Sequence, residues 1–397
     1  MIYELDGVIR PYAWGSRTAI PELLGRPPSD QPAAELWYGA HPDDPARVAG
    51  TTLDQLIASD PVRMLGERVV GEFGPRLPFL LKVLAAETAL SIQMHPNRAQ
   101  ARAGFAAEDA AGVPRDAPNR NYRDDNHKPE LLCALTEFDA LCGFRPVSRT
   151  LELIDALDVA ELAPYRSALT GPDGLRAAFT ALLTAEDRPP LVDAVVGALP
   201  RLAGTEWADL GAALTRVAGD FPGDVGIAVA LLLNFVRLAP GEAIFLAAGN
   251  VHAYLHGLGV EILANSDNVL RCGLTGKHID VPELLEITDF TPLVEPRCPD
   301  DGLDFGRHFE IPVADFALSS ADLDAYRKAG RPVGSCATGT AGLPYLVLCA
   351  SGEVTVNVDG TVARLGPGRA AFVPAREAAF TLTGSGETFL ATVGGLD

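Results

Sequence analysis

The feature that most constrains this fold is a set of metal-ligand side chains on three segments that lie far apart in the chain. Gln93 and His95 lie in Ser91-Ile-Gln-Met-His-Pro, Glu130 ends Asp125-Asn-His-Lys-Pro-Glu, and His252 lies in Gly249-Asn-Val-His-Ala-Tyr. Each segment is predicted to be a strand or a strand end, where residues two apart share a face. Gln93 and His95 can therefore reach one point, and one site requires all three segments to lie together.

The donor set itself indicates the metal and the kind of site. Two imidazoles, one carboxylate and one amide oxygen form a borderline nitrogen and oxygen set that suits Zn²⁺. Such a set leaves room for a water or a substrate oxygen on the metal. We therefore expect a catalytic site rather than a structural one.

The hydrophobic pattern predicts a mainly β fold with an inserted α-helical module. Residues 1–147 alternate short apolar strands with Gly/Pro turns, interrupted by helices near 53–58 and 98–107 and by a polar surface loop over 112–125. Residues 148–238 repeat Leu, Ala and Val at three- and four-residue spacing, which predicts five or six helices. The almost wholly apolar stretch 225–238 is expected to be the last of these helices, and buried.

Strand patterns return after residue 241 and are clearest in the tail. Alternating apolar residues with Ser-Gly and Asp-Gly turns over 345–362 predict hairpins, and short, evenly spaced strands are typical of jelly rolls. The phrase at 238–248 echoes the one at 365–375, which indicates two related β-barrels. We expect a first barrel from 1–147 and 239–300, the helical domain at 148–238, and a C-terminal barrel at 301–397.

Composition excludes several partners. The net charge of −20 repels nucleic acid and anionic membranes. No apolar run approaches the roughly 20 residues that span a bilayer, and the N-terminus lacks the basic and apolar regions of a signal peptide. We expect a cytoplasmic protein whose six scattered cysteines are reduced. Three of the four lysines fall in or beside the motif segments, which favours a small anionic substrate.

Taken together, the motifs resemble the class I mannose-6-phosphate isomerases (phosphomannose isomerases), zinc-dependent enzymes of the bicupin family. The resemblance runs in order from residue 11 to about 283, and its motifs are highly specific in combination. They are Pro11-Tyr-Ala-Trp-Gly-Ser, Ala34-Glu-Leu-Trp, Pro78-Phe-Leu-Leu-Lys-Val-Leu, Leu90-Ser-Ile-Gln-Met-His-Pro, Asn126-His-Lys-Pro-Glu, Asn250-Val-His-Ala-Tyr and Asn265-Ser-Asp-Asn-Val-Leu-Arg-Cys-Gly-Leu-Thr.

The resemblance implies an enzyme of carbohydrate metabolism and GDP-mannose supply that interconverts mannose 6-phosphate and fructose 6-phosphate. It implies that Gln93, His95, Glu130 and His252 bind one zinc ion per chain, and that Arg271 is catalytic. We expect a monomer. Gly276 departs from the family pattern, which has proline after Leu-Thr, and this difference loosens the expected hold on Lys277. The C-terminal barrel is expected to be metal-free, because residues 310–397 contain no histidine.

Aldose–ketose isomerisation needs ring opening, a base that moves a proton between C2 and C1, and stabilisation of an enediolate. Arg271 stays protonated at any working pH and suits the last task. Lys128 and Glu261 are both candidates for the base, and the sequence does not choose between them. A zinc ion near Lys128 would favour loss of its proton, whereas an apolar setting would raise the pKa of Glu261.

The remaining candidates fall into three groups. His127 and Asp267 are candidates for ring opening, although each has a structural alternative as an orienting or turn residue. Ser91, Lys82 and Lys277 are candidates for the phosphate end, and Trp14 and Tyr254 for the sugar pocket. The other histidines, at 41, 256, 278 and 308, are expected to be structural or exposed.

Two other functions compete with the isomerase. One is a cupin-type metal-dependent oxygenase that uses iron, and the glutamine ligand and the lysine set argue against it. The other is a non-catalytic sugar-phosphate-binding paralogue, which the complete set of ligands with Arg271 and Lys128 disfavours.

Overall fold

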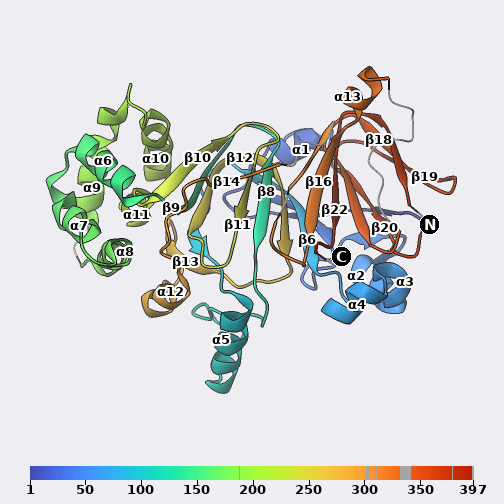
Figure 1. The fold of residues 1–397 in the computed structure, drawn as a ribbon, viewed down its shortest axis with the longest axis horizontal. Helices are drawn as coiled ribbons and strands as arrows, with labels where there is room; N and C mark the ends of the chain where they lie inside the picture. Colours follow the sequence, from blue (N-terminus) through green and yellow to red (C-terminus); the bar gives the residue numbers. More distant parts are fainter. Residues whose placement is uncertain (187, 301–304, 310, 331–340, 378, 396–397) are drawn as a thin grey trace.

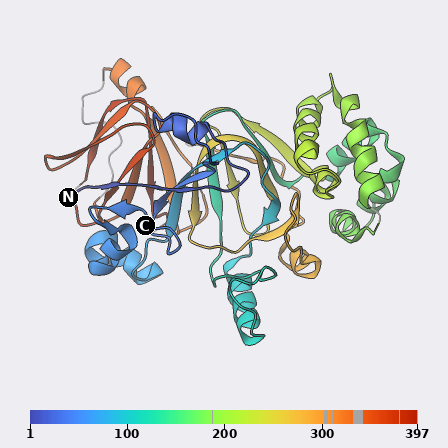
Figure 2. The same ribbon diagram turned by 180° about the vertical axis from the view of Figure 1, so that it is seen from behind.

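The computed structural model describes residues 1–186, 188–300, 305–309, 311–330, 341–377 and 379–395. A helical module lies at one end, a large antiparallel sheet occupies the middle, and a second set of antiparallel strands lies at the other end (Figure 1). Seen from behind, both chain ends lie on the side of the second strand set (Figure 2). The chain therefore mixes helices with several antiparallel sheets.

The middle sheet is organised around one long strand, β12 (His252–Ala264). Its second half pairs with β6 and β8, whereas its first half pairs with β7 and β9. Gly257, with φ 130°, marks the change of partners, and a Cβ there would lie 2.6 Å from the Phe138 ring. The neighbours along the sheet are β14 (Arg297–Cys298), β11 (Ala243–Leu246), β8 (Glu130–Ala134), β6 (Phe79–Ala86), β3 (Glu35–Gly39) and β2 (Val8–Arg10), and the others are β7 (Ile92–Met94), β9 (Phe138–Phe144), β10 (Leu233–Leu238) and β13 (Leu270–Gly273).

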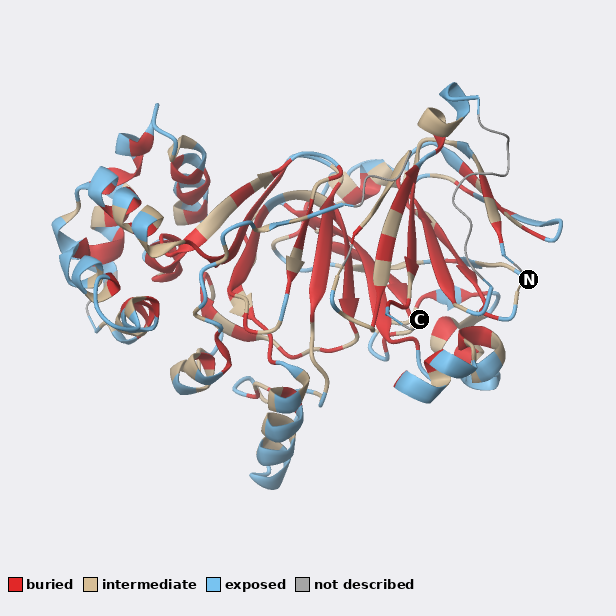
Figure 3. Ribbon diagram, viewed as in Figure 1, coloured by how far each residue is buried: buried red, intermediate tan, exposed pale blue. Residues whose placement is uncertain are grey.

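Strand alternation divides this sheet into two faces. On β6, Leu81 and Val83 face the core shared with the C-terminal strands, so Lys82 between them faces the other way. In the same manner β8 turns Glu130 and β12 turns Glu261 to the inner face. Nearly all the central strands are buried on both faces (Figure 3), so the inner charges lie in a closed interior.

The C-terminal part contains two sheets. The larger has the order β1-β20-β17-β22-β16-β15 and the smaller β19-β18-β21. The strands are β1 (Tyr3–Leu5), β15 (Gly306–His308), β16 (Ala317–Asp322), β17 (Tyr345–Cys349), β18 (Glu353–Val358), β19 (Thr361–Leu365), β20 (Arg369–Val373), β21 (Thr381–Ser385) and β22 (Glu387–Thr392). Strands form where predicted over 345–362, and β18 and β19 make a hairpin across the Asp-Gly turn. Strands β17 and β18, which flank the Ser-Gly turn, lie in different sheets, so the first predicted hairpin was wrong. Strand β1 pairs with β20, so the N-terminus completes the C-terminal sheet, which the sequence did not indicate.

The helical module contains α6 (Val147–Leu157), α7 (Ala163–Leu169), α8 (Gly174–Thr184), α9 (Arg188–Ala198), α10 (Ala208–Asp220) and α11 (Gly226–Ala230). The expected final helix over 225–238 was wrong. Only 226–230 is helical, and 233–238 forms strand β10 against β9. Periodicity cannot separate a buried strand from a buried helix in a short apolar run. Here the hydrogen bonds to the free edge of β9 decide the conformation.

The remaining helices flank the strands. The helices predicted near 53–58 and 98–107 are α2 (Leu53–Ser59) and α5 (Arg98–Ala110), and α5 begins at Asn97, whose side chain forms a capping box with Gln100. The others are α1 (Ala19–Leu23), α3 (Pro61–Leu65), α4 (Glu67–Phe73), α12 (Val281–Ile287) and α13 (Leu323–Lys328).

Two of the composition-based expectations can be compared with the structure. Among the described residues, no helix is both long and apolar enough to cross a membrane. The five cysteines that the structure describes are free thiols, and Cys336 lies outside the described residues.

The core between the middle sheet and the C-terminal sheet makes a testable contribution to stability. Phe372 on β20 is fully buried in this core. Phe372→Ala should lower the free energy of unfolding by about 3–5 kcal/mol, because it removes buried surface and leaves a cavity. Urea unfolding measures this change. Val362→Ala is the control, since Val362 is 50% exposed, and its effect should stay within about 0.5 kcal/mol.

Candidate active site

Three of the predicted ligands converge on one point inside the middle sheet. His95 Nε2 lies 3.4 Å from one Glu130 oxygen, and His252 Nε2 lies 3.4 Å from the other. All three side chains are buried, and one ligand atom from each lies within 4.8 Å of the others. The strands explain the convergence, because His252 pairs with Gln93 in register while Glu130 pairs with Leu263 farther along the same β12.

Backbone carbonyls orient both imidazoles. His95 Nδ1 lies 2.6 Å from the Asn268 carbonyl oxygen, and His252 Nδ1 lies 2.9 Å from that of Asn250. A carbonyl oxygen only accepts, so each Nδ1 carries the hydrogen and donates it. Each Nε2 then presents a lone pair toward Glu130. This is the tautomer that a metal ligand requires, held by hydrogen bonds behind the ligands.

The centre contains buried polar atoms that the protein leaves unsatisfied. Among the described residues, neither His95 Nε2 nor Glu130 Oε2 has a hydrogen-bond partner, although both atoms are inaccessible to water. Such atoms are costly to bury unless something binds them. A cation such as Zn²⁺ satisfies a carboxylate and two imidazole lone pairs together. The residues present therefore fit this metal.

Gln93 lies at the edge of the same centre. Its amide nitrogen is 3.5 Å from His252 Nε2, and rotation of the amide about its terminal bond exchanges this nitrogen for the oxygen. The fourth predicted ligand is thus beside the other three, on the strand next to His252.

Lys128 sets the charge of the centre. Its ammonium lies 2.8 Å from Glu130 Oε1. Burial alone would raise the pKa of Glu130, but the Lys128 ammonium holds it well below its usual range. Burial, reinforced by Lys128, lowers the pKa of His95 to about 4. At neutral pH the site therefore holds a carboxylate and a neutral imidazole, the forms that bind metal.

A second group of buried charges lies on the same inner face. Lys82 Nζ is 3.3 Å from Glu261 and 3.5 Å from Glu35. Burial opposes the charge on Lys82, yet these two carboxylates raise its pKa above the usual value. Tyr254 donates a 2.8 Å hydrogen bond to Glu261, and Trp37 donates one of 2.5 Å to Glu35. Lys82 was predicted to bind the phosphate. In the structure two carboxylates already neutralise its charge, so this geometry does not favour that role.

Burial, and then the charge of Glu130, raises the pKa of Glu261. A raised pKa for Glu261 was predicted from the apolar residues that flank it in the sequence. The Tyr254 ring also lies 6.1 Å from the His252 ring, so the group around Glu261 adjoins the metal-ligand group directly.

A third group is cationic. Arg271 on β13 pairs in register with Gln93, and cross-strand partners face the same side. Burial and the nearby Arg123 lower the pKa of Arg271, while Arg271, burial and Arg123 lower that of Lys277. Among the described carboxylates, none forms an ion pair with these three cations. Ser91 lies directly before β7, two residues from Gln93. These cations adjoin the metal centre without a counter-ion.

The remaining candidates lie apart from the metal ligands to different degrees. The Asp267 carboxylate is 3.6 Å from His41 Nε2, and the His41 ring meets the edge of Trp37. Trp14 stacks on Tyr12, and it packs against the cluster that contains Tyr254. His127 is not brought to the centre, since its imidazole contacts Asp315 and Arg98 instead.

Comparison with known proteins decides the family. Residues 2–147 match the model "Phosphomannose isomerase type I, catalytic domain". The chain is 41% identical to the mannose-6-phosphate isomerase of Escherichia coli K12, over 96% of this chain and 97% of the relative, and 34% identical to that of Bos taurus, over 98% and 94%. The chain belongs to the type I phosphomannose isomerases.

Solved structures of type I phosphomannose isomerases agree with this assignment. The Salmonella typhimurium mannose 6-phosphate isomerase, solved with fructose 6-phosphate and zinc, superposes with a TM-score of 0.89 at 37% identity, over 99% of each chain. Another mannose 6-phosphate isomerase, solved with zinc and yttrium, superposes with the same TM-score at 38% identity.

Several residues of the site were missed by sequence reasoning. Asn268 is fully buried, and its amide receives hydrogen bonds from the backbone N–H groups of Arg123 and Asp124 and donates to the carbonyls of Asp124 and Asn126. It thereby ties the 123–126 loop to the loop whose carbonyl orients His95. The Asn-rich motif around 265–268 was a signal, but its hydrogen-bonding partners were far away in sequence.

This arrangement predicts that Asn268 supports metal binding. Asn268→Ala removes the amide that aligns the two loops, so the carbonyl that orients His95 should shift. Metal affinity should fall by about 10–100-fold, the usual effect of losing support behind a ligand. Competition with a chelator measures this.

The control is Asn234→Ala. Asn234 also uses its amide to bind several carbonyls, including those of Cys142 and Leu293, but on β10, two strands away from β12. Equal losses of metal affinity in the two variants would contradict a specific role for Asn268.

Proposed function

We propose that the chain interconverts mannose 6-phosphate and fructose 6-phosphate as a metal-dependent aldose–ketose isomerase. The observation that carries the proposal is the buried His95/Glu130/His252 cluster with unsatisfied ligand atoms, in a chain of this family. A carboxylate group with a raised pKa and an uncompensated cationic group adjoin the cluster. Together they supply the acid–base and charge-stabilising groups that the reaction needs.

For the architecture, we infer two cupin-type jelly-roll barrels with an inserted helical domain. Every strand pair that the structure describes is antiparallel, and β12 bends to pair with strands on both sides of the site. The proposed units are 1–147 with 239–300, 148–238 and 301–397. Two strands cross these bounds, because β10 at 233–238 pairs within the middle sheet and β1 pairs within the C-terminal sheet. The monomeric state and the cytoplasmic location also remain predictions.

The metal would be held by Gln93, His95, Glu130 and His252. When bound, Zn²⁺ would stabilise negative charge on the sugar oxygens. The chain's own contribution is to keep the ligands in their metal-binding forms, because backbone carbonyls fix both imidazole tautomers and Lys128 keeps Glu130 ionised.

Proton transfer between C2 and C1 is assigned to the pair Lys128 and Glu261, with the individual base left open. Lys128 lies beside the metal ligands, and Glu261 is buried with a hydrogen bond from Tyr254. Asp267, with His41 behind it, is the favoured group for ring opening. His127 faces away from the ligands, so its direct participation is not favoured by this geometry.

The phosphate end is assigned to Lys277 and Arg123, with Ser91 nearby. Arg271 pairs in register with Gln93 and is close enough to Arg123 and Lys277 for their charges to interact, so we assign it to the reacting oxygens rather than to the phosphate. In a chain of net charge −20, such a local group of cations is needed to attract a dianion.

Activity should depend on the metal. Prolonged chelation should abolish turnover of mannose 6-phosphate in a coupled assay, and added Zn²⁺ should restore it. His252→Ala should bind metal much more weakly, because one of the ligands is lost. His256→Ala is the control, an exposed histidine on the same strand. Full turnover in a metal-free sample would exclude the site, and bound iron with oxygen uptake would favour the oxygenase alternative.

Arg271 should act on the transition state. Arg271→Ala should lower kcat by about two to four orders of magnitude and change KM less, because enediolate charge develops only as the proton leaves carbon. Arg271→Lys should restore little, since one ammonium cannot span two oxygens as a guanidinium does. Both variants should still bind zinc. A raised KM with normal kcat would instead make Arg271 a substrate-binding residue.

A further inference from the structure

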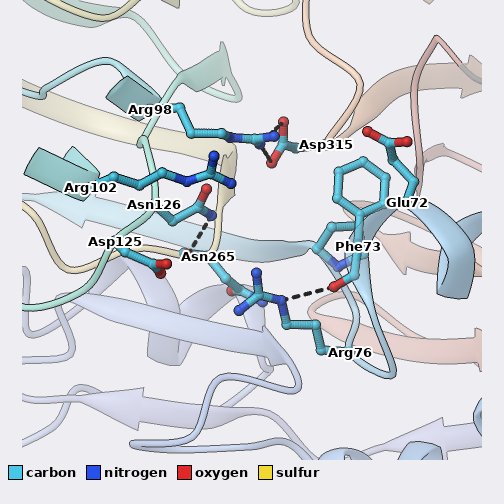
Figure 4. A pocket seen from close by; sticks show the side chains of 10 residues that line it. Glu72, Phe73, Arg76, Arg98, Arg102, Asp125, Asn126, Asn265 and Asp315 are labelled. Atoms are coloured by element: carbon cyan, nitrogen blue, oxygen red, sulfur yellow. Dashed lines mark hydrogen bonds and ion pairs between the residues drawn. The ribbon is translucent and has the colours of Figure 1, made fainter. Parts of the chain in front are cut away.

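A buried carboxylate from the C-terminal part of the chain contacts the segment that carries Lys128. Asp315 lies just before β16 and is 2% exposed. Its oxygens lie 3.0 and 3.2 Å from Arg98 Nη2, and one of them lies 2.9 Å from His127 Nε2. Both partners belong to the catalytic part of the chain, Arg98 at the start of α5 and His127 next to Lys128. Figure 4 shows the Arg98–Asp315 contact.

The contact with Asp315 determines the hydrogen-bonding role of His127. Its Nε2 also lies 2.8 Å from Arg98 Nη2, and one nitrogen cannot both accept from Arg98 and donate to Asp315. A lone pair on Nε2 would face a carboxylate oxygen at 2.9 Å. We therefore place the hydrogen on Nε2, which donates to Asp315, while Arg98 donates to the same carboxylate.

Asp315 is itself held firmly. The neighbouring Ala314 carbonyl accepts a hydrogen bond from Gly394, and the following Phe316 is fully buried in the core between the two sheets. The carboxylate thus belongs to a fixed part of the C-terminal sheet, and it is a suitable anchor for a less regular segment.

Asn126, the residue before His127, is also held, because it donates to the Asn265 carbonyl and its own carbonyl accepts from Asn268. The His127 side chain itself contacts Asp315 and Arg98. A small cavity of about 80 Å³ lies behind it, lined in part by Arg76, Arg98, Arg102, Asn126 and Asp315 (Figure 4). Most of the side chains that line it are polar or charged, so apolar packing contributes little there. The polar contacts of His127 therefore restrain the segment where apolar packing does not.

The orientation of the His127 side chain determines the direction in which the Lys128 side chain points. Pro129 restricts the backbone of the residue before it, so Lys128 is confined to extended conformations. In an extended segment, neighbouring side chains face opposite ways. Holding His127 outward against Asp315 consequently holds Lys128 inward, where its ammonium meets Glu130 at 2.8 Å.

We propose that Asp315 is a positioning residue for the isomerase reaction, acting through His127 to fix the direction of Lys128. The inference rests on the proposed function, because Lys128 belongs to the proposed proton-transfer pair. It gives the C-terminal part a role in the chemistry beyond covering the middle sheet.

The test compares Asp315→Ala, His127→Ala and the double variant in the zinc-loaded enzyme, with kcat, KM, zinc content and unfolding midpoint measured for each. Asp315→Ala should lower kcat by about 10–100-fold with KM and zinc content little changed. The double variant should lose no more than the worse single variant, because both changes release the same restraint. Asp315→Asn retains an acceptor for His127 and should keep more activity than Asp315→Ala.

The matched control is Asp139→Ala. Asp139 is also a buried carboxylate held by two cationic side chains, with Arg216 Nη2 at 2.6 Å and Arg237 Nε at 2.8 Å, but it joins the helical module to β9. It should lower the unfolding midpoint and leave kcat near wild type.

Three results would overturn the inference: unchanged kcat in Asp315→Ala, kcat losses that multiply in the double variant, or a loss in Asp315→Ala matched by Asp139→Ala. If Asp315→Ala does not fold, a kcat in Asp315→Asn and His127→Ala equal to wild type would overturn it as well. A wild-type enzyme that fails to convert mannose 6-phosphate would instead contradict the proposed function.

Discussion

The structure depends on one buried carboxylate. Glu130 carries a negative charge in the interior of the middle sheet, where a lone charge is very costly. Two imidazoles and the Lys128 ammonium surround it, and each of these is fixed in turn by a backbone carbonyl or by the extended segment before β8. Lys128 is the cation that compensates this charge, while the hydrogen-bonded loops hold the two neutral imidazoles with their lone pairs directed at the same point.

The inner face of the sheet shows how strand alternation separates chemistry from stability. On β6, β8 and β12, odd and even positions go to different faces, so the apolar core and the charged interior are built from the same strands. Lys82 and Glu261 face each other across two paired strands, in register. An apolar layer on one side therefore holds Lys82, Glu130 and Glu261 on the other, each on a regular strand.

The cluster of His95, Glu130 and His252 was predictable because these residue types are distinctive and lie in recognisable motifs. Gln93 and His95 are two residues apart on a strand, so the sequence alone predicts that they share a face. The family motifs predicted the places of Glu130 and His252. The setting of Lys82 was not predictable, since its two carboxylate partners lie on β3 and β12 and the pairing exists only after folding. Arg123, Asn268 and Asp315 were missed for the same reason. Strand β10 was misread because its apolar pattern fits a helix equally well, and only the edge of β9 decides.

The position of the N-terminal strand has a consequence for how the chain is made. β1 is synthesised well before its partner β20, and most of the described chain lies between the two strands. This pairing is not available to β1 until β20 has been synthesised, and contacts between such distant residues form slowly. During synthesis the exposed edge of β1 is open to incorrect pairing. Closing the C-terminal sheet is therefore a late event, and Asp315 can reach His127 only long after the segment that carries His127 and Lys128 has been synthesised.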